Sequence, residues 1–139
     1  MPDTVPHRKL THEGALKVIR AAADRAAEMG VPQCIAVVDD GGNLVAFLRM
    51  DGAKVLSIRT AQRKAATAAS SRIPTGDLSA DHAVSLGLVT GGRLTNLKGG
   101  LPIVVDGAVV GGVGVSSGTG DQDLEVARAG IAALEAAAR

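Results

Sequence analysis

Aromatic residues are almost absent from this chain of 139 residues, which has one Phe and neither Trp nor Tyr. Proteins that bind single-stranded nucleic acid stack the bases on aromatic side chains, and that platform is missing here. The charges are nearly balanced, with 15 Lys and Arg against 14 Asp and Glu, so no basic face is expected to contact a phosphate backbone. We therefore expect no nucleic acid partner.

Cysteines and long apolar runs are also scarce. Cys34 is the only cysteine, which excludes an intrachain disulfide and a cysteine-rich metal site. The three histidines, His7, His12 and His82, lack the spacing of metal ligands, so no metal site is predicted. No run approaches the roughly 18 apolar residues of a membrane span, and residues 1–9 lack the apolar segment of a secretion signal. We expect a cytoplasmic protein with no membrane partner.

The chain is instead rich in glycine, alanine and aliphatic residues, and these have a regular order. Residues 1–10 are predicted to form a flexible arm, and residues 11–139 a single domain large enough to bury a core. Helical spacing of apolar residues predicts four helices. They are expected over residues 12–29, 54–70 and 81–88, and from residue 121 onward.

Short apolar segments between these helices predict strands, and polar turns join them in pairs. The strands are expected over residues 33–38, 44–50, 93–97, 103–105 and 108–115. Asp106-Gly107, between the last two, is a dipeptide that accepts the positive φ angles of a type I′ turn. Strands joined by hairpins pair in antiparallel fashion. The sequence therefore predicts an α/β (α+β) domain with three α/β/α layers and a five-stranded antiparallel sheet.

A glycine-rich loop before the last helix marks the first part of a predicted site. The strand that leads to it contains Gly111, Gly112 and Gly114, and strand glycines indicate close approach by another backbone or by a ligand. Ser116 to Gly120 then lead into the helix, where Thr119 and Gln122 have the spacing of a capping box. Free N–H groups at such a helix N-terminus can bind an anion.

Polar residues elsewhere form the second part of the predicted site. Arg49 and Asp51 follow a strand, and Lys64 lies on the alanine-rich second helix. One interpretation is a set of surface charges in which a solvated Lys64 contributes little to stability. The other is a polar cluster that faces Gly99-Gly100 and the loop from Ser116 to Thr119 and holds a small carboxylate or carbonyl ligand. The sequence leaves both open.

Several short motifs occur in a fixed order along residues 10–138. They are L-T-x-x-x-A from Leu10, V-V-D-x-G-G-x-L-V-A-F from Val37, R-M-D-G-A from Arg49, G-G-x-P-I from Gly99 and D-G-x-V-V-G-G-x-G-V-S from Asp106. In this order they resemble the GlcG/HbpS family, to which the C-terminal domain of PduO proteins also belongs. The resemblance implies a profilin-like fold, a homo-oligomer and haem binding or haem degradation.

Two functions are then compatible with the sequence. The first is an oligomeric protein that binds haem or a small organic metabolite in a pocket built from glycine-rich loops, with no other cofactor. Its ligand-binding residues are predicted to be Arg49, Gly99, Gly100, Ser116, Thr119 and Gln122. The alternative is a cofactor-independent lyase, isomerase or hydratase for a small oxo or hydroxy acid. Arg49 or Lys64 would then hold the carboxylate, and Asp51 or Asp121 would transfer a proton if burial raised the pKa of its carboxyl.

Overall fold

The computed structural model describes residues 1–137. Within this range the strands are joined in two hairpins, and helices precede, separate and follow these hairpins along the chain. The elements are α1 (His12–Met29), β1 (Cys34–Asp39), β2 (Leu44–Arg49), α2 (Ser57–Ser71), α3 (Ala80–Val89), β3 (Gly100–Val105), β4 (Ala108–Ser116) and α4 (Gly120–Ala137). Residues 138 and 139 of the predicted domain lie outside the described residues.

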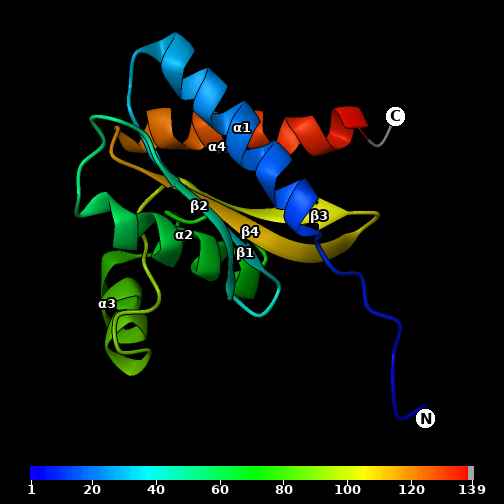
Figure 1. Cartoon of the computed structure of the whole chain (residues 1–139). Helices are drawn as coiled ribbons and strands as arrows, with labels where there is room; N and C mark the ends of the chain where they lie inside the picture. Colours follow the sequence, from blue (N-terminus) through cyan, green and yellow to red (C-terminus); the bar gives the residue numbers. More distant parts are fainter. Residues whose placement is uncertain (138–139) are drawn as a thin grey trace.

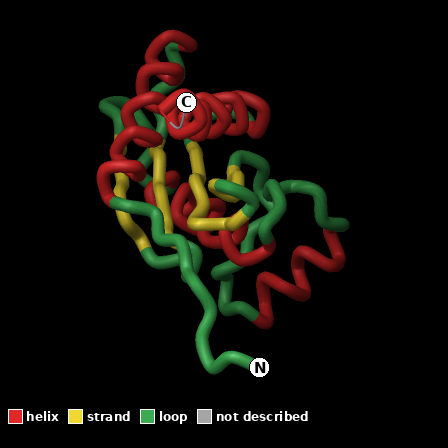
Figure 2. The backbone as a smooth tube through the Cα atoms, turned by 90° about the vertical axis from the view of Figure 1, so that its right-hand side faces the viewer, coloured by secondary structure: helices red, strands yellow, loops and turns green. Residues whose placement is uncertain are grey.

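A four-stranded antiparallel sheet forms the centre of the fold, with strand order β2-β1-β4-β3. Helices α1 and α4 pack on one face, and α2 packs on the other, while α3 projects beside α2 (Figures 1 and 2). The apolar side chains divide accordingly: Ile35 and Val37 join the core under α1 and α4, whereas Ala36 and Val38 face α2. The predicted α/β class and antiparallel pairing are confirmed.

The predicted fifth strand over residues 93–97 is wrong, because this segment is irregular. Its N–H groups donate to side-chain hydroxyls instead of to a neighbouring strand. Leu94 N donates to Thr90 Oγ1 (3.1 Å) and Thr95 N to Thr67 Oγ1 (3.1 Å). Threonine hydroxyls compete in this way with a backbone ladder. The segment therefore forms a wall beside α2 and adds nothing to the sheet.

Small residues let α2 lie directly on the sheet. A Cβ atom at Gly114 would lie 2.0 Å from Ala61 O, and one at Gly112 would lie 2.3 Å from Ala65 O. Such distances are too short for any side chain, so glycine is required where the helix backbone crosses the strand. The predicted close approach is thus confirmed, and the approaching group is the backbone of α2.

The predicted turns and helix ends are largely confirmed. Asp106 (φ 49°) and Gly107 (φ 78°) both have the positive φ of a type I′ turn, and Gly30 (φ 70°) ends α1 in the left-handed conformation. Helix α2 begins three residues later than predicted, because Ser57 N donates to Lys54 O and closes a turn first. As a result Val55, which lies inside the predicted helix, precedes the observed one and is 65% exposed.

Residues 1–9 form no helix or strand and are exposed, and they extend away from the rest of the domain (Figure 1). Two side-chain contacts connect the arm to the sheet turns: His7 Nε2 lies 3.3 Å from Asp40 Oδ2, and Arg8 forms an ion pair with Asp106 (3.0 Å). Leu10 is buried in the core and fixes the start of the domain. Among residues 1–137, no helix combines the length and the apolar character that crossing a bilayer requires.

Candidate functional site

Lys64 is buried, contrary to the interpretation of it as a solvated surface charge. Its side chain is 3% exposed, and its Nζ donates to Val115 O (2.8 Å) and to Asp123 Oδ2 (2.9 Å). The pair joins α2 to the first turn of α4 at the end of β4. Removing either partner of such a buried ion pair is strongly destabilising, because the remaining charge would stay in the interior without compensation.

The predicted glycine loops do lie around this pair. Gly99 is buried, and a Cβ atom there would lie 2.7 Å from Asp123 Cβ and 3.0 Å from Lys64 Nζ. Gly100 packs equally closely on the backbone of Lys64, where a Cβ atom would lie 2.5 Å from its carbonyl oxygen. Gly118 N donates to Asp123 Oδ1 (3.0 Å). The loops therefore close over the ion pair and leave its charged groups in the interior.

The start of α4 is capped as the sequence predicts. Gln122 N donates to Thr119 Oγ1 (3.2 Å), and Thr119 N donates to Gln122 Oε1 (2.9 Å). These two bonds form the reciprocal capping box. Ser116 is buried at the end of β4, opposite Cys34 of β1. Two of the N–H groups that could have bound an anion, those of Thr119 and Gln122, are thus already occupied by side chains of the same segment.

Replacing Thr119 with alanine should destabilise the protein by about 1 kcal/mol, because the N-cap hydroxyl is lost. Thr119→Ser keeps the hydroxyl and is the matched control, with stability close to that of the wild type. Urea unfolding of the two variants measures the difference. Equal losses for both would show that the methyl group of Thr119 matters and the cap does not.

The remaining predicted site residues lie on the surface. Arg49 and Asp51 are exposed at the end of β2, and neither takes part in an ion pair within residues 1–137. Asp121 is exposed and pairs with Lys98, whose ammonium group lowers the pKa of that carboxyl. A lowered pKa keeps Asp121 ionised. The raised pKa that the enzyme alternative requires of it is therefore not found.

Cys34 is a buried thiol, and burial raises its pKa, with Arg49 opposing the change. A raised pKa keeps the thiol protonated and unreactive. Within the described part of the chain, no group of three or more His, Cys, Asp or Glu side chains could hold a metal ion.

The sequence analysis did not identify Asp123 and Gln33 as members of this cluster. The carboxamide of Gln33 is fully buried near Gly118, and neither its oxygen nor its nitrogen has a hydrogen-bond partner. A signal for the burial of Lys64 was present, since Lys64 lies on the same helical stripe as Ala61, Ala65 and Ala68. No comparable signal pointed to Gln33.

An open groove lies on the other side of α2, away from the buried pair. It has a volume of about 790 Å³ and runs between α2 and the irregular segment 91–97. Its walls include Val55, Leu56 and Leu97, which are 65%, 86% and 57% exposed. Apolar side chains this exposed on a concave surface are typical of a binding site. We call this the α2 groove.

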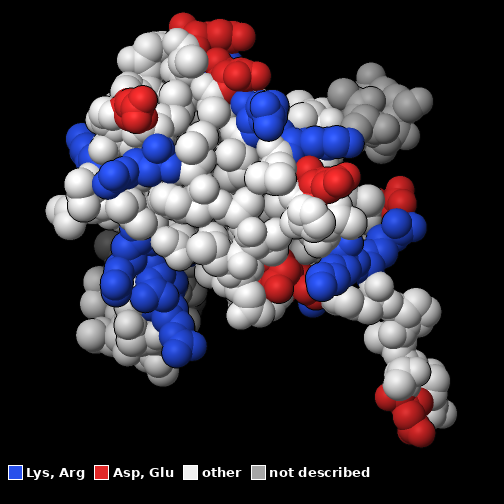
Figure 3. Space-filling model, in the orientation of Figure 1, with Lys and Arg blue, Asp and Glu red and all other residues white. Residues whose placement is uncertain are grey.

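Arginine side chains border the α2 groove. Arg59 and Arg63 line it, and Arg63 also lines two neighbouring hollows, one of which includes Arg93. None of the three takes part in an ion pair within residues 1–137. Basic side chains gather over α2 and α3 on the face drawn in Figure 3, without acidic side chains beside them. The groove is therefore suited to an apolar molecule that carries carboxylates.

The fold and these surfaces define a small α/β protein with a closed polar centre and an open amphiphilic groove beside α2. The chain belongs to the HbpS-like family: the model described as "Haem degrading protein HbpS-like" matches residues 10–132. Protein GlcG of Escherichia coli K12 is 41% identical over 110 residues, which cover 77% of this chain and 81% of GlcG. The predicted family is confirmed.

Solved structures agree with this assignment. The Klebsiella pneumoniae protein ORFY superimposes with a TM-score of 0.92 at 31% identity, covering 98% of this chain and 97% of ORFY. The structure described as a PduOC:heme complex has a TM-score of 0.83 at 30% identity, covering 91% of this chain and 95% of that protein. The second of these relatives was crystallised with haem.

Proposed function

We propose that this protein binds haem in the α2 groove. The observation that carries the proposal is the combination of exposed apolar walls with Arg59 and Arg63, which have no acidic partner among residues 1–137. Haem has the matching chemistry, a flat apolar macrocycle with two propionate groups on one edge. The family description and the haem complex of a relative support the same ligand.

The groove fits the macrocycle and its carboxylates, and it offers the iron no strong ligand. Leu56 and Leu97 would contact the ring, and Arg59 and Arg63 would bind the propionates. No His, Cys, Met or Tyr lines the groove. Bound haem supplies redox chemistry and ligand binding at its iron, with a potential set by the axial ligands. An iron without strong protein ligands suits reversible capture of haem.

The closed centre around Lys64 is a less suitable place for a ligand. Lys64 and Asp123 are each 3% exposed, and the lysine already donates to two acceptors. A group that transfers protons must come within hydrogen-bond reach of its substrate. This burial favours the binding function over the cofactor-independent enzyme, and the α2 groove over the glycine-rich loops.

Self-association is the other part of the proposal. Helix α3 exposes Val84, Leu88 and Val89 at 62%, 78% and 78% of their surface. An apolar surface of this kind is typical of a contact between subunits. The proposed homo-oligomer thus agrees with the apolar composition, and the cytoplasmic location stays a prediction from the sequence.

Charge reversal at the α2 groove should weaken haem binding by about tenfold or more, because each propionate loses a charge-assisted hydrogen bond. The test is a hemin titration followed at the Soret band with Arg59→Glu and Arg63→Glu. Arg49→Glu is the matched control, since Arg49 is exposed and does not line the α2 groove. It pairs instead with Cys34 of β1, which pairs on its other side with Ser116, the first residue of the glycine-rich loop.

The control separates the two sites. We expect Arg49→Glu to bind hemin like the wild type. Weaker binding by Arg49→Glu together with unchanged binding by the two groove variants would move the ligand to the glycine-rich loops. A wild-type protein that gives no saturable Soret change would rule out haem binding itself.

A further inference from the structure

A second hollow lies beside the α2 groove, and most of the side chains that line it are polar. It has a volume of about 1070 Å³. Arg63, Thr67 and Ser70 line it from α2, on the side of the helix opposite the alanines that face the sheet. The β1–β2 turn over residues 40–43 forms one wall, and residues 89–94 form the other. We call this the polar hollow.

Contacts with α2 hold both walls of the polar hollow in place. A Cβ atom at Gly42 would lie 3.6 Å from the Cβ of Ala66, so the β1–β2 turn packs directly on the helix. On the other side, Thr95 N donates to the hydroxyl of the buried Thr67 (3.1 Å). Because the Thr67 oxygen accepts this bond, its hydroxyl proton remains free for another acceptor. The polar hollow is therefore preformed and offers a hydrogen-bond donor from α2.

Two arginines give the polar hollow an excess of positive charge. Arg63 is half-buried and Arg93 is exposed, and neither takes part in an ion pair within residues 1–137. Among the described residues that line the hollow, the one acidic side chain is Asp40, whose Oδ2 lies 3.3 Å from His7 Nε2. The hollow thus presents two guanidinium groups to an anion and one carboxylate to a hydroxyl group.

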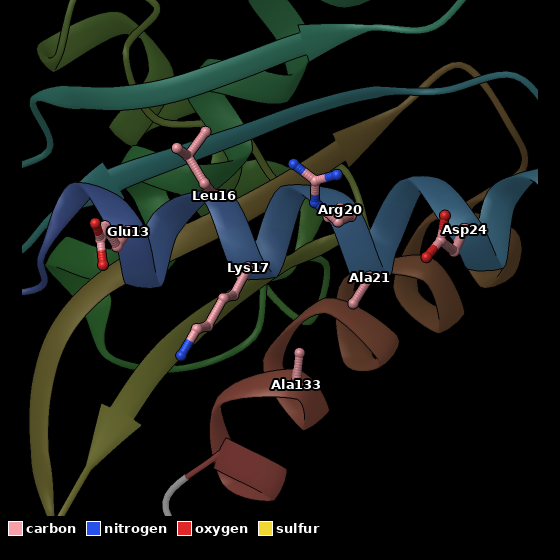
Figure 4. A pocket seen from close by; sticks show the side chains of 7 residues that line it. All are labelled: Glu13, Leu16, Lys17, Arg20, Ala21, Asp24 and Ala133. Carbon is pink, nitrogen blue, oxygen red and sulfur yellow. The ribbon is translucent and has the colours of Figure 1, made fainter.

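The groove between α1 and α4, on the other face of the sheet, has a different charge pattern. Figure 4 shows Glu13 and Asp24 at the two ends of a row on α1, with Lys17 and Arg20 between them. Each base there has an acid four residues away, at the spacing of a helical pair. An anion in that groove would meet acids as well as bases, so the polar hollow is the better anion site.

We propose that the polar hollow binds a small hydroxylated molecule that carries a phosphate monoester. Such a phosphate has about two negative charges at neutral pH and three acceptor oxygens. Arg63 and Arg93 can each donate two parallel hydrogen bonds to it, and the Thr67 hydroxyl is a further donor. A carboxylate has only two oxygens, which one arginine can satisfy, so this set of donors suits a phosphate better. Asp40 would accept a hydrogen bond from a hydroxyl group of the ligand.

This site is distinct from the proposed haem site, although Arg63 lines both. Arg93 lines the polar hollow and not the α2 groove, whereas Arg59 lines the α2 groove and not the polar hollow. Replacing these two arginines one at a time therefore separates the two ligands. Failure of the protein to bind hemin would leave the phosphate measurements unchanged.

The test is a titration of the haem-free protein with glycerol 3-phosphate, followed by the amide signals in its NMR spectrum. Saturable shifts are expected at Asn43, Ser70 and Arg93, which line the polar hollow. Arg93→Glu should weaken binding by about tenfold or more, because charge-assisted hydrogen bonds to the phosphate are lost. Arg59→Glu is the matched control and should bind glycerol 3-phosphate like the wild type. Circular dichroism should show both variants folded.

Three further compounds test the chemistry of the ligand. Glycerol lacks the charge and should not bind, while ethyl phosphate lacks hydroxyl groups and succinate lacks a phosphate, so both should bind more weakly. Succinate that binds as tightly as glycerol 3-phosphate would contradict the choice of phosphate, and ethyl phosphate that does so would contradict the role of Asp40. Without saturable shifts at the polar hollow, or with equal losses in Arg59→Glu and Arg93→Glu, the proposed site is wrong.

Discussion

Lys64→Ala should cost about 3–5 kcal/mol of unfolding free energy, because it leaves the Asp123 carboxylate buried without its cation. Both side chains are 3% exposed, and the carboxylate retains only the bond from Gly118 N (3.0 Å). The interpretation of Lys64 as a solvated surface charge predicts almost no loss instead. Urea unfolding measures the free energy, and an unchanged m-value shows that the variant exposes the same surface.

Lys98→Ala is the control for this experiment, because Lys98 also pairs with an aspartate, Asp121, but at the exposed surface. Screening by water makes that pair worth little, so the change should be small. A double replacement, Lys64→Met with Asp123→Leu, removes both buried charges and should recover much of the loss. Equal stability of Lys64→Ala and Lys98→Ala would contradict the burial of Lys64.

Gly114→Ala should lower the free energy of unfolding by about 3 kcal/mol or more. Such a loss is at or above the largest values usually caused by adding a methyl group to a well-packed core. The added Cβ would lie 2.0 Å from Ala61 O and 2.5 Å from Ala65 N, and both are backbone atoms of α2. Neither can move without displacing the helix from the sheet. Thermal and urea unfolding of the variant measure the loss.

Gly87→Ala is the matched control, since Gly87 lies within α3 and a Cβ atom there meets only Leu94 O at 4.0 Å. Alanine in a helix interior is favoured over glycine, so this variant should be about 0.5–1 kcal/mol more stable than the wild type. If Gly114→Ala unfolds at the wild-type urea concentration, α2 does not pack on β4 as described.

Local chemistry explains how much of the fold could be predicted from the sequence. The end of α1 at Met29, the Asp106-Gly107 turn and the capping box of Thr119 and Gln122 each depend on a few neighbouring residues, and all were predicted correctly. The false strand over 93–97 arose because its N–H groups donate to hydroxyls, one of them on Thr67, which lies 28 residues away from Thr95. A contact between residues so far apart in the sequence does not affect the local spacing of apolar residues, from which the strand was predicted.

The candidate site was harder to predict because its members meet only in three dimensions. Lys64 and the glycine loops were identified, yet Asp123 was not, and it lies 59 residues from Lys64 along the chain. The α2 groove was not predicted, since Arg59 and Arg63 are ordinary surface residues of an amphipathic helix until segment 91–97 packs beside them. The predicted roles of Arg49 and Thr119 in ligand binding and of Asp51 in proton transfer stay predictions.

The central claim is that haem binds in the α2 groove, and the NMR spectrum of the protein with hemin tests it most directly. The unpaired electrons of ferric iron broaden amide signals close to the metal, and gallium protoporphyrin provides the control without that effect. The account predicts broadening at Thr60, Gly91 and Gly92, which line the groove, with sharp signals retained from Ser117 to Gln122. Broadening centred on Ser117 to Gln122, with the groove signals unchanged, would contradict it.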